Sequence, residues 1–402
     1  MKIGVFVDSY KPIVTGVVHS VDLLRSGLEA LGHEVHIFAP AARGYRDVED
    51  RVYRFPAINL SRRIPSPLAL PVSPRVLALI PRLGLDVIHT QHPFPIGRLG
   101  VTLARRLGVP AVYTFHTQYE HYVHYVPLPR GFVRAAARWA VVGQAERCQL
   151  VICPAPSVRD LLLSYGIRRP IEILPNPIDL GRFAGADGGA ARRRLGIASE
   201  ERVLLYCGRL AREKNLAFML QALADVLVRP PGARLLIVGH GTERAALARL
   251  AASLALGDRV VFAGEVAYAD VAQYYAAADL FVMTSVTEVK PLAVLEAMAS
   301  GLPVVAVAAH GLNDTVTHGA DGLLTDHDPA AFADAVRRLL ADDAGRRMMG
   351  RRARQTAEQY DVRTIARRLA DLYAAARDLH RQGIGDGRRQ GRSRAAPSEE
   401  VQ

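Results

Sequence analysis

Two glutamates, Glu288 and Glu296, stand eight residues apart around the predicted start of a helix. The apolar run DLFVM before them predicts a buried strand, and Pro291 suits the first turn of a helix, where no amide donor is needed. Gly301 and then Pro303 mark the end of that helix. In an open parallel sheet, ligands bind at the carboxyl ends of the strands, so both carboxylates are placed to accept hydrogen bonds from sugar or ribose hydroxyl groups. The alternative interpretation is a capping glutamate followed by an ordinary helical glutamate.

Further motifs precede and follow these glutamates in a fixed order. They are PNPID at 175–179, CGRLAREKN at 207–215, VGHGTE at 238–243, FAGEV at 262–266 and, after the second glutamate, AMA and GLPVV. In this order and spacing, the set resembles the donor-site motifs of retaining glycosyltransferases of the GT-B fold, family 4. The resemblance covers nearly the whole chain. It implies a hexosyltransferase that takes its sugar from a nucleotide sugar, UDP-glucose-like or GDP-mannose-like, and needs no metal and no cofactor.

The resemblance also implies roles for individual residues. Glu288 would bind the donor sugar, Glu296 the ribose, and Arg209 with Lys214 the diphosphate, where fixed cations stabilise the charge of the leaving group. The remaining donor contacts, several of them through the backbone, fall on Gly16, Gly208, Gly241, Val266, Lys290 and Leu292. The alternatives are a solvated basic loop for the two cations and ordinary turn positions for the glycines.

The segment YTFHTQYEHYVHYVP at 113–127 is the richest polar cluster of the N-terminal half. His116 follows a predicted strand, and in similar transferases the equivalent histidine contacts the transferred sugar. Together with HTQHPFPIGRLG at 89–100, this cluster resembles bacterial diacylglycerol glucosyltransferases, which implies a lipid acceptor near Tyr119, Glu120 and His121. Helical spacing of the histidines also suits metal ligands, but the enzyme type that the chain resembles needs no metal.

Three positions depart from the family pattern, and one of them is Pro177 in PNPID, where glycine is frequent. Pro291 stands where glycine is common and offers no backbone donor, and Thr15 stands where asparagine usually precedes Gly16. The departure at Pro291 keeps open a second hypothesis, a non-catalytic relative that binds a nucleotide sugar or a membrane. Release of the nucleotide in the presence of an acceptor distinguishes the two.

The formal net charge is +12, and most of the excess lies in the first 180 residues. Without a zinc finger, an aromatic RNA-binding motif or a long Lys/Arg block, nucleic acid is not the predicted partner. A cationic stripe of Arg130, Arg134 and Arg138 beside Trp139 instead suggests a helix on an anionic membrane surface, with a solvated or buried helix as the alternative. We therefore expect a cytoplasmic protein, peripheral on the inner face of the cell membrane if its acceptor is a lipid, and a soluble acceptor remains an alternative.

Length and pattern predict an α/β protein of two domains, because 402 residues with 50% hydrophobic content suffice for two cores. The resemblance makes these two Rossmann-like doubly wound domains that face a central cleft. A dinucleotide-binding oxidoreductase is disfavoured, because the first strand leads to DSYKPIVTG rather than to a G-x-G-x-x-G turn. The expected divisions are an acceptor domain at 1–180, a donor domain at 181–361, a helix at 362–381 that crosses back to the N-terminal domain, and a disordered tail at 382–402.

Overall fold

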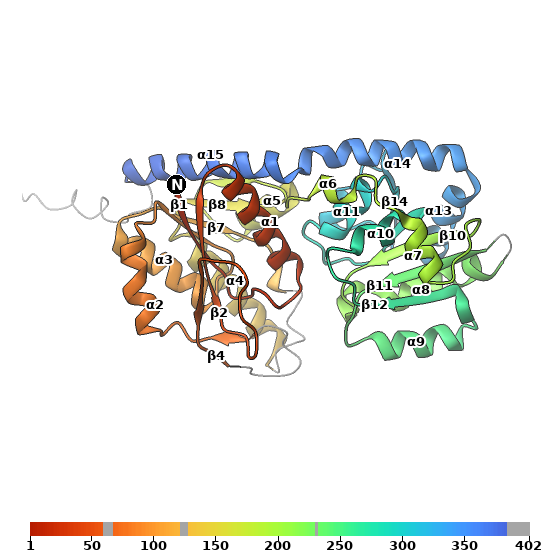
Figure 1. Cartoon of the computed structure of the whole chain (residues 1–402), viewed down its shortest axis with the longest axis horizontal. Coiled ribbons are helices and arrows are strands. Elements are labelled where there is room, and N and C mark those ends of the chain that lie inside the picture. The colour runs from red at the N-terminus through yellow and green to blue at the C-terminus, as the bar shows by residue number, and fades with distance from the viewer. Residues whose placement is uncertain (59–66, 121–127, 230–231, 384–402) are drawn as a thin grey trace, which may run out of the picture. The chain divides into compact units, whose positions relative to one another are not determined.

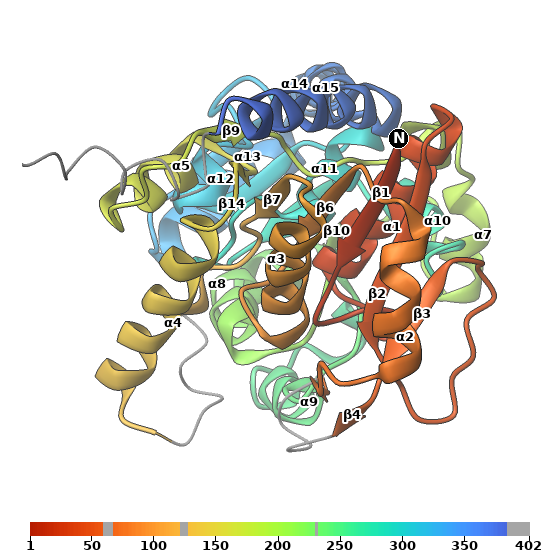
Figure 2. The same ribbon diagram turned by 90° about the vertical axis from the view of Figure 1, so that its left-hand side faces the viewer.

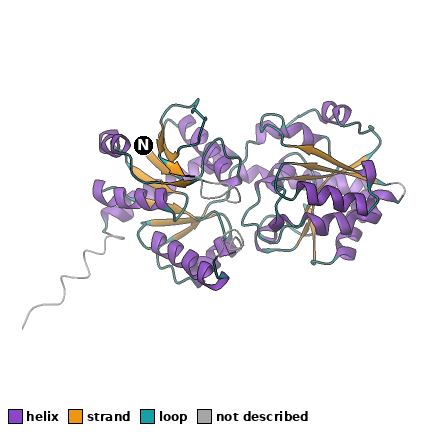
Figure 3. Cartoon of the chain, turned by 90° about the horizontal axis from the view of Figure 1, so that it is seen from below, coloured by secondary structure: helices purple, strands orange, loops and turns teal. Residues whose placement is uncertain are grey.

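The computed structural model describes residues 1–58, 67–120, 128–229 and 232–383. It divides into two compact units (Figure 1). The first unit contains Met1–Cys153, Arg159–Leu174 and the chain from Ala366, and the second contains Pro154–Val158 and Pro175–Ile365. In each unit a parallel sheet is covered by helices, as Figure 3 shows by secondary structure.

The first unit contains a seven-stranded parallel sheet in the order β3-β2-β1-β6-β7-β8-β9, and a small antiparallel pair, β4 with β5. Its strands are β1 (Lys2–Phe6), β2 (Glu34–Pro40), β3 (Val52–Phe55), β4 (Ala57–Ile58), β5 (Leu68–Ala69), β6 (Val87–Thr90), β7 (Ala111–Thr114), β8 (Leu150–Cys153) and β9 (Ile171–Ile173). Its helices are α1 (Gly16–Ala30), α2 (Pro74–Leu79), the 3₁₀ turn η1 (Ile80–Leu83), α3 (Pro95–Leu107), α4 (Arg130–Ala145), α5 (Pro156–Ser164) and most of α15 (Val362–Arg381). Helix α3 packs on β6, β1 and β7 (Figure 2).

The second unit repeats this plan with a six-stranded parallel sheet in the order β12-β11-β10-β13-β14-β15. Its strands are β10 (Arg202–Cys207), β11 (Ala233–Val238), β12 (Val260–Gly264), β13 (Leu280–Met283), β14 (Val304–Val307) and β15 (Gly322–Thr325). Its helices are α6 (Leu180–Phe183), α7 (Gly188–Arg194), η3 (Arg212–Lys214), α8 (Leu216–Val228), α9 (Arg244–Ser253), η4 (Gly257–Arg259), α10 (Val271–Ala276), α11 (Leu292–Ala299), α12 (His310–Asn313), α13 (Pro329–Ala341), α14 (Asp343–Ala357) and η5 (Glu358–Tyr360).

The strand sequences explain the parallel sheets. Central strands buried on both faces need continuous apolar runs, and Val203, Leu204 and Leu205 of β10 are all 0% exposed. Helices cover these faces with one apolar side. On α1, Val18, Val21 and Leu28 are buried, whereas Leu31 follows the helix end and is 38% exposed.

Local capping fixes several helix starts. Thr15 precedes α1 and its hydroxyl accepts a hydrogen bond from the Val18 amide at 3.3 Å, so threonine performs the capping role here. Asp328 caps α13 in the same way, and Pro329 occupies the first helical position. Helix α5 and strand β9 precede the Pro/Gly-rich stretch that begins after Leu174.

Candidate active site

In the second unit the strand order reverses between β10 and β13, which are neighbours in the sheet. Ligands of doubly wound sheets bind at such a switch point, outside the carboxyl ends of the strands. Two hydroxyl groups after β13 join the loops there. The Thr284 hydroxyl donates to the Lys214 carbonyl at 3.2 Å, and the Ser285 hydroxyl donates to the Glu213 carbonyl at 3.2 Å. The loops that carry the predicted cations and the first predicted glutamate are thus fixed side by side.

Lys214 and Glu288 form an ion pair across this switch point, with 2.5 Å between Nζ and Oε1. Their side chains are only 16% and 12% exposed. Burial acts to raise the pKa of Glu288, but the Lys214 charge and hydrogen bonds from Lys214 and Ser285 more than offset it, so the pKa lies below its ordinary value. The glutamate is therefore ionised at neutral pH and ready to accept hydrogen bonds.

Arg209 pairs with Glu213 on the same loop, with 2.6 Å between Nη2 and Oε1. The guanidinium side chain is 34% exposed, and its charge also helps to lower the pKa of Glu288. The structure therefore brings together Arg209, Lys214 and Glu288, three of the residues that the sequence predicted. Two cations close together suit a diphosphate. They would interact with its negative charge as well as with the two carboxylates beside them.

Glu296 lies on α11 and is 7% exposed. Burial raises its pKa to about 7, although a hydrogen bond from Tyr275 and the charge of Arg182 act in the opposite direction. The Tyr275 hydroxyl donates to Oε2 at 2.7 Å. The sequence placed Glu296 inside the helix correctly but gave no indication of Tyr275, because the pair Tyr274 and Tyr275 in a helical pattern indicates only packing.

The glycines of the motifs CGRLAREKN and VGHGTE allow close backbone packing. Gly208 has φ +153°, a region that other residues rarely adopt. A Cβ on Gly241 would lie 2.1 Å from the Leu210 carbonyl oxygen, and one on Gly239 would lie 2.0 Å from that of Gly208. The loops after β10 and β11 therefore pack backbone to backbone, which explains the glycines structurally. Their donor contacts stay a prediction.

The loop from Glu288 to the start of α11 departs from expectation in two ways. Pro291 is the N-cap residue, so the helix begins at Leu292 rather than at the proline. The Lys290 side chain is 6% exposed and directed to the Asp314 carbonyl and the Tyr360 hydroxyl, at 2.8 Å and 3.1 Å. The ammonium group is therefore engaged by these two oxygens, and the predicted donor contact of Lys290 stays a prediction. The amides of Lys290 and Leu292 remain predicted contacts, as does the backbone of the half-buried Val266 after β12.

In the first unit, His116 follows β7 and its Nε2 lies 2.5 Å from the Gln91 amide oxygen. Burial lowers its pKa to about 3, with smaller effects from His92 and His89, so the imidazole is neutral at physiological pH. Gly16 is the exposed first residue of α1, at the start of which backbone amides are available to an anion. Both positions agree with the predicted elements, and their ligands remain predictions.

Sequence reasoning missed a second buried pair at the switch point of this sheet, between β1 and β6. The Asp8 amide donates to His92 Nδ1 at 3.2 Å, and the Asp8 carboxylate accepts the Ile96 and Gly97 amides at 2.9 and 3.0 Å. Burial raises the pKa of Asp8 to about 6 although these amides lower it. The signal was available, because Asp8 directly follows the apolar run VFV and His92 lies two residues after the end of β6.

The predicted acceptor residues are only partly described. Tyr119 packs edge-on against Phe94 and Phe115, with ring centroids 5.0 and 6.2 Å apart, and Glu120 is partly buried. His121 lies outside the described residues. The structure thus shows a packing role for Tyr119 and leaves the acceptor assignment as a prediction.

Helix α4 carries the predicted cationic stripe. Arg130, Arg134 and Trp139 are exposed, and Trp139 is 70% exposed, so the alternative of a buried tryptophan is excluded. Arg138 donates to the Ser164 carbonyl at 2.9 Å and lies 4.8 Å from the centroid of the Tyr165 ring. Arg138 is nevertheless exposed like Arg130 and Arg134, so the whole predicted stripe lies on the surface of α4. None of the described helices is both long and apolar enough to cross a membrane.

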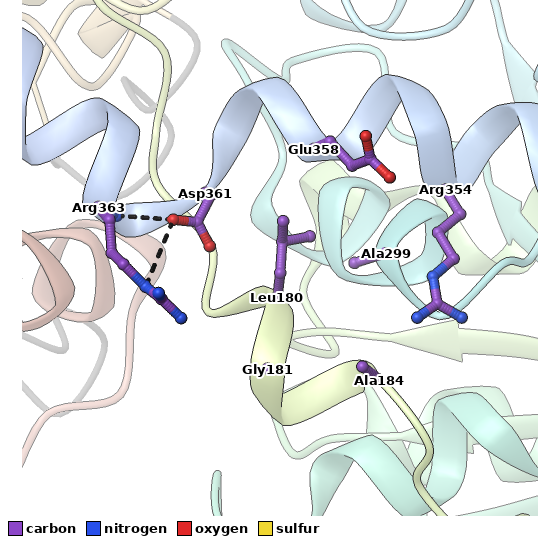
Figure 4. Close-up of a pocket in the computed structure, with 8 residues that line it drawn as sticks. All are labelled: Leu180, Gly181, Ala184, Ala299, Arg354, Glu358, Asp361 and Arg363. Carbon is purple, nitrogen blue, oxygen red and sulfur yellow. Dashed lines mark hydrogen bonds and ion pairs between the residues drawn. The ribbon is translucent and has the colours of Figure 1, made fainter.

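A pocket of about 410 Å³ lies elsewhere in the second unit (Figure 4). It is lined by Leu180, Gly181, Ala184, Ala299, Arg354, Glu358, Asp361 and Arg363, which include no predicted donor residue. Among the described residues, no group of three or more His, Cys, Asp or Glu side chains is arranged to hold a metal ion.

Comparison with known proteins agrees with this geometry over both units. Residues 14–182 match the family described as Glycosyltransferase Family 4, and residues 189–356 match the one described as Glycosyl transferases group 1. The fold, the carboxylate–cation cluster and these matches together define an enzyme, a glycosyltransferase that takes its sugar from a nucleotide sugar.

Two relatives and one solved structure show which members of this class the chain is similar to. An alpha-monoglucosyldiacylglycerol synthase of Streptococcus pneumoniae is 35% identical over 338 residues, which are 82% of this chain and 77% of the relative. A D-inositol 3-phosphate glycosyltransferase of Nocardia farcinica is 36% identical over 330 residues, 77% of this chain and 72% of the relative. Anabaena Alr3699/HepE in complex with UDP-glucose, 22% identical, shares the fold with a TM-score of 0.75 over 93% of this chain and 100% of that one. The chain therefore belongs to glycosyltransferase family 4, of the GT-B fold.

Proposed function

We propose that the protein transfers a glucose-like hexose, with retained anomeric configuration, from UDP-glucose or a similar nucleotide sugar to a lipid hydroxyl such as that of diacylglycerol. The donor assignment rests on the cluster of Arg209, Lys214 and Glu288 at one switch point, with Glu296 on the helix α11 that follows. The UDP-glucose bound by the structurally similar Anabaena protein supports a uridine donor.

The acceptor half is supported by the relative whose name describes synthesis of alpha-monoglucosyldiacylglycerol. The exposed α4 surface with Arg130, Arg134 and Trp139 provides cationic and aromatic groups suited to an anionic membrane. On this proposal the protein works at the inner face of the cell membrane. Inositol phosphate, suggested by the equally similar second relative, is the soluble alternative.

The proposed chemistry gives each charged residue one task. The bond from the anomeric carbon to the diphosphate breaks while the acceptor oxygen bonds on the same face, and the departing phosphate accepts the hydroxyl proton. Arg209 and Lys214 stabilise the charge that develops on the diphosphate, and Glu288 holds the sugar hydroxyl groups. Glu296 binds the ribose, and neutral His116 contacts the transferred sugar. The reaction uses the nucleotide sugar as a substrate and calls for no metal or further cofactor.

A thermal-shift panel tests the donor assignment, because a ligand that binds only the folded state raises the melting temperature with its concentration. UDP and UDP-glucose should raise it more than GDP and GDP-mannose, and Arg209→Ala should largely remove the shift. Acceptor-dependent release of UDP then separates an enzyme from a non-catalytic binder. Stabilisation by neither nucleotide, or an undiminished shift in Arg209→Ala, would contradict the assignment.

A further inference from the structure

Lys290 is a buried cation in the loop between β13 and α11, two residues after Glu288. Its ammonium group donates to the Asp314 carbonyl at 2.8 Å and to the Tyr360 hydroxyl at 3.1 Å, and lies 4.8 Å from the centroid of the Tyr360 ring. An ammonium group is costly to bury unless hydrogen bonds compensate for lost water. Burial accordingly lowers the pKa of Lys290 to about 8, although Asp314 and Asp321 act to raise it. The contacts therefore hold the side chain in one place.

The backbone around Lys290 is held from two further directions. The Asn176 side-chain amide, in the PNPID motif, donates to the Lys290 carbonyl at 2.9 Å. On the other side Gly311 approaches so closely that a Cβ there would lie 2.3 Å from the Glu288 carbonyl oxygen. The segment that carries Glu288 is thus fixed through its own carbonyls and through the Lys290 ammonium group.

Asn176 and Tyr360 belong to the two stretches by which the chain enters and leaves the second unit. The unit begins again at Pro175 and ends at Ile365. Within it these stretches pair, because the Ile178 amide donates to the Tyr360 carbonyl at 2.8 Å and the Val362 amide to the Ile178 carbonyl at 2.9 Å. Figure 4 shows Asp361 at this point, between η5 and α15.

We infer that Lys290 is a positioning residue, whose ammonium group ties the Glu288 loop to these connecting stretches and thereby sets the direction of the Glu288 carboxylate. The inference rests on the proposed role of Glu288 as the contact to the donor sugar. Catalysis is sensitive to such placement, since a shift of about 1 Å in a contacting group can lower the rate on the order of a hundredfold. The Lys290 side chain touches neither sugar nor phosphate in this account.

A double-mutant cycle separates positioning from general support of the fold. Lys290→Met keeps an unbranched side chain without the charge, and Tyr360→Phe removes only the hydroxyl group that Lys290 contacts. Each should lower kcat by about tenfold or more and leave the affinity for UDP within about twofold, because Arg209, Lys214 and Glu296 still hold the nucleotide. In a Glu288→Gln background the same changes should have less than about a twofold effect, since the carboxylate that they position is already gone. Arg354→Met, an exposed cation on α14, is the control and should behave like the wild type.

The possible outcomes distinguish the positioning role of Lys290 from the proposed role of Glu288. An equal loss of kcat from Lys290→Met with and without Glu288 would overturn the positioning role, and so would a wild-type kcat in both Lys290→Met and Tyr360→Phe. If Lys290→Met does not fold, Tyr360→Phe decides alone. An unaffected Glu288→Gln enzyme would instead contradict the proposed function, whatever the result at position 290.

Discussion

The predicted donor residues keep their charges in pairs. Lys214 neutralises Glu288 and Glu213 neutralises Arg209, at 2.5 and 2.6 Å. Such pairs limit the desolvation cost of holding ions in a half-buried site. They also preorganise the cations for binding a diphosphate. The exception is Glu296, whose polar partner is a tyrosine hydroxyl and whose pKa is raised rather than lowered.

Glu296 therefore makes a testable contribution to stability. Its pKa is about 7 in the folded protein against an ordinary 4.5, so the folded state retains a proton that the unfolded state has lost. The free energy of unfolding should fall as the pH rises from about 4.5 to about 7, by about 3 kcal/mol, and stay reduced above that. Glu296→Gln, which keeps an oxygen for Tyr275, should thus stabilise the unliganded protein more at pH 8 than at pH 5. Urea unfolding at both pH values measures the difference.

The same substitution should weaken UDP binding, because an amide presents one acceptor oxygen to a ribose diol, whereas a carboxylate presents two. Glu288→Gln is the matched control and should leave UDP binding largely intact while it lowers turnover. A Glu296→Gln protein that is less stable than the wild type at both pH values would contradict the raised pKa of Glu296. One that binds UDP equally well would contradict the ribose contact.

Among the elements, the sequence predicted the apolar strands of the second sheet best. The runs RVLLYC, ARLLIV, LFVM and VVAV became β10, β11, β13 and β14 because strands buried on both faces leave a continuous apolar pattern. The short strands β3 and β9 have mixed exposure and gave no such pattern. The contacts of Lys290 were also beyond prediction, because they join residues far apart in sequence, such as Tyr360.

The next prediction concerns helix α4 and its binding to anionic membranes. Because Arg138 also contacts Ser164 and Tyr165, the test changes only the other two exposed arginines of the stripe, Arg130 and Arg134. Each arginine near an anionic surface contributes about 1 kcal/mol, so the change of Arg130 and Arg134 to serine should weaken binding to anionic vesicles by about thirtyfold. Co-sedimentation at physiological salt measures it. Serine at the exposed Arg347 and Arg351 of α14 is the control, and equal losses in both variants would indicate net charge rather than a docking helix.

At the scale of the whole molecule, the chain contains two similar parallel sheets, each with polar residues at its switch point. The sequence indicated this duplication through alternating strand and helix patterns and through the ordered motifs of the second half. The acceptor did not follow from the same reasoning. A lipid and an inositol phosphate appear in the names of relatives of nearly equal identity, and His121 lies outside the described residues.

The most direct test of the account follows labelled glucose from UDP-glucose into products, with diacylglycerol in anionic vesicles and inositol phosphate offered side by side. The account predicts label in the organic phase as a glucosyl lipid, an α-anomeric linkage by proton NMR, and loss of this product in Glu288→Gln. A β-linked lipid would contradict retention, and label confined to inositol phosphate would contradict the lipid acceptor. Labelled glucose released only to water, or no release of UDP at all, would contradict the central claim that this site transfers a sugar to a lipid hydroxyl.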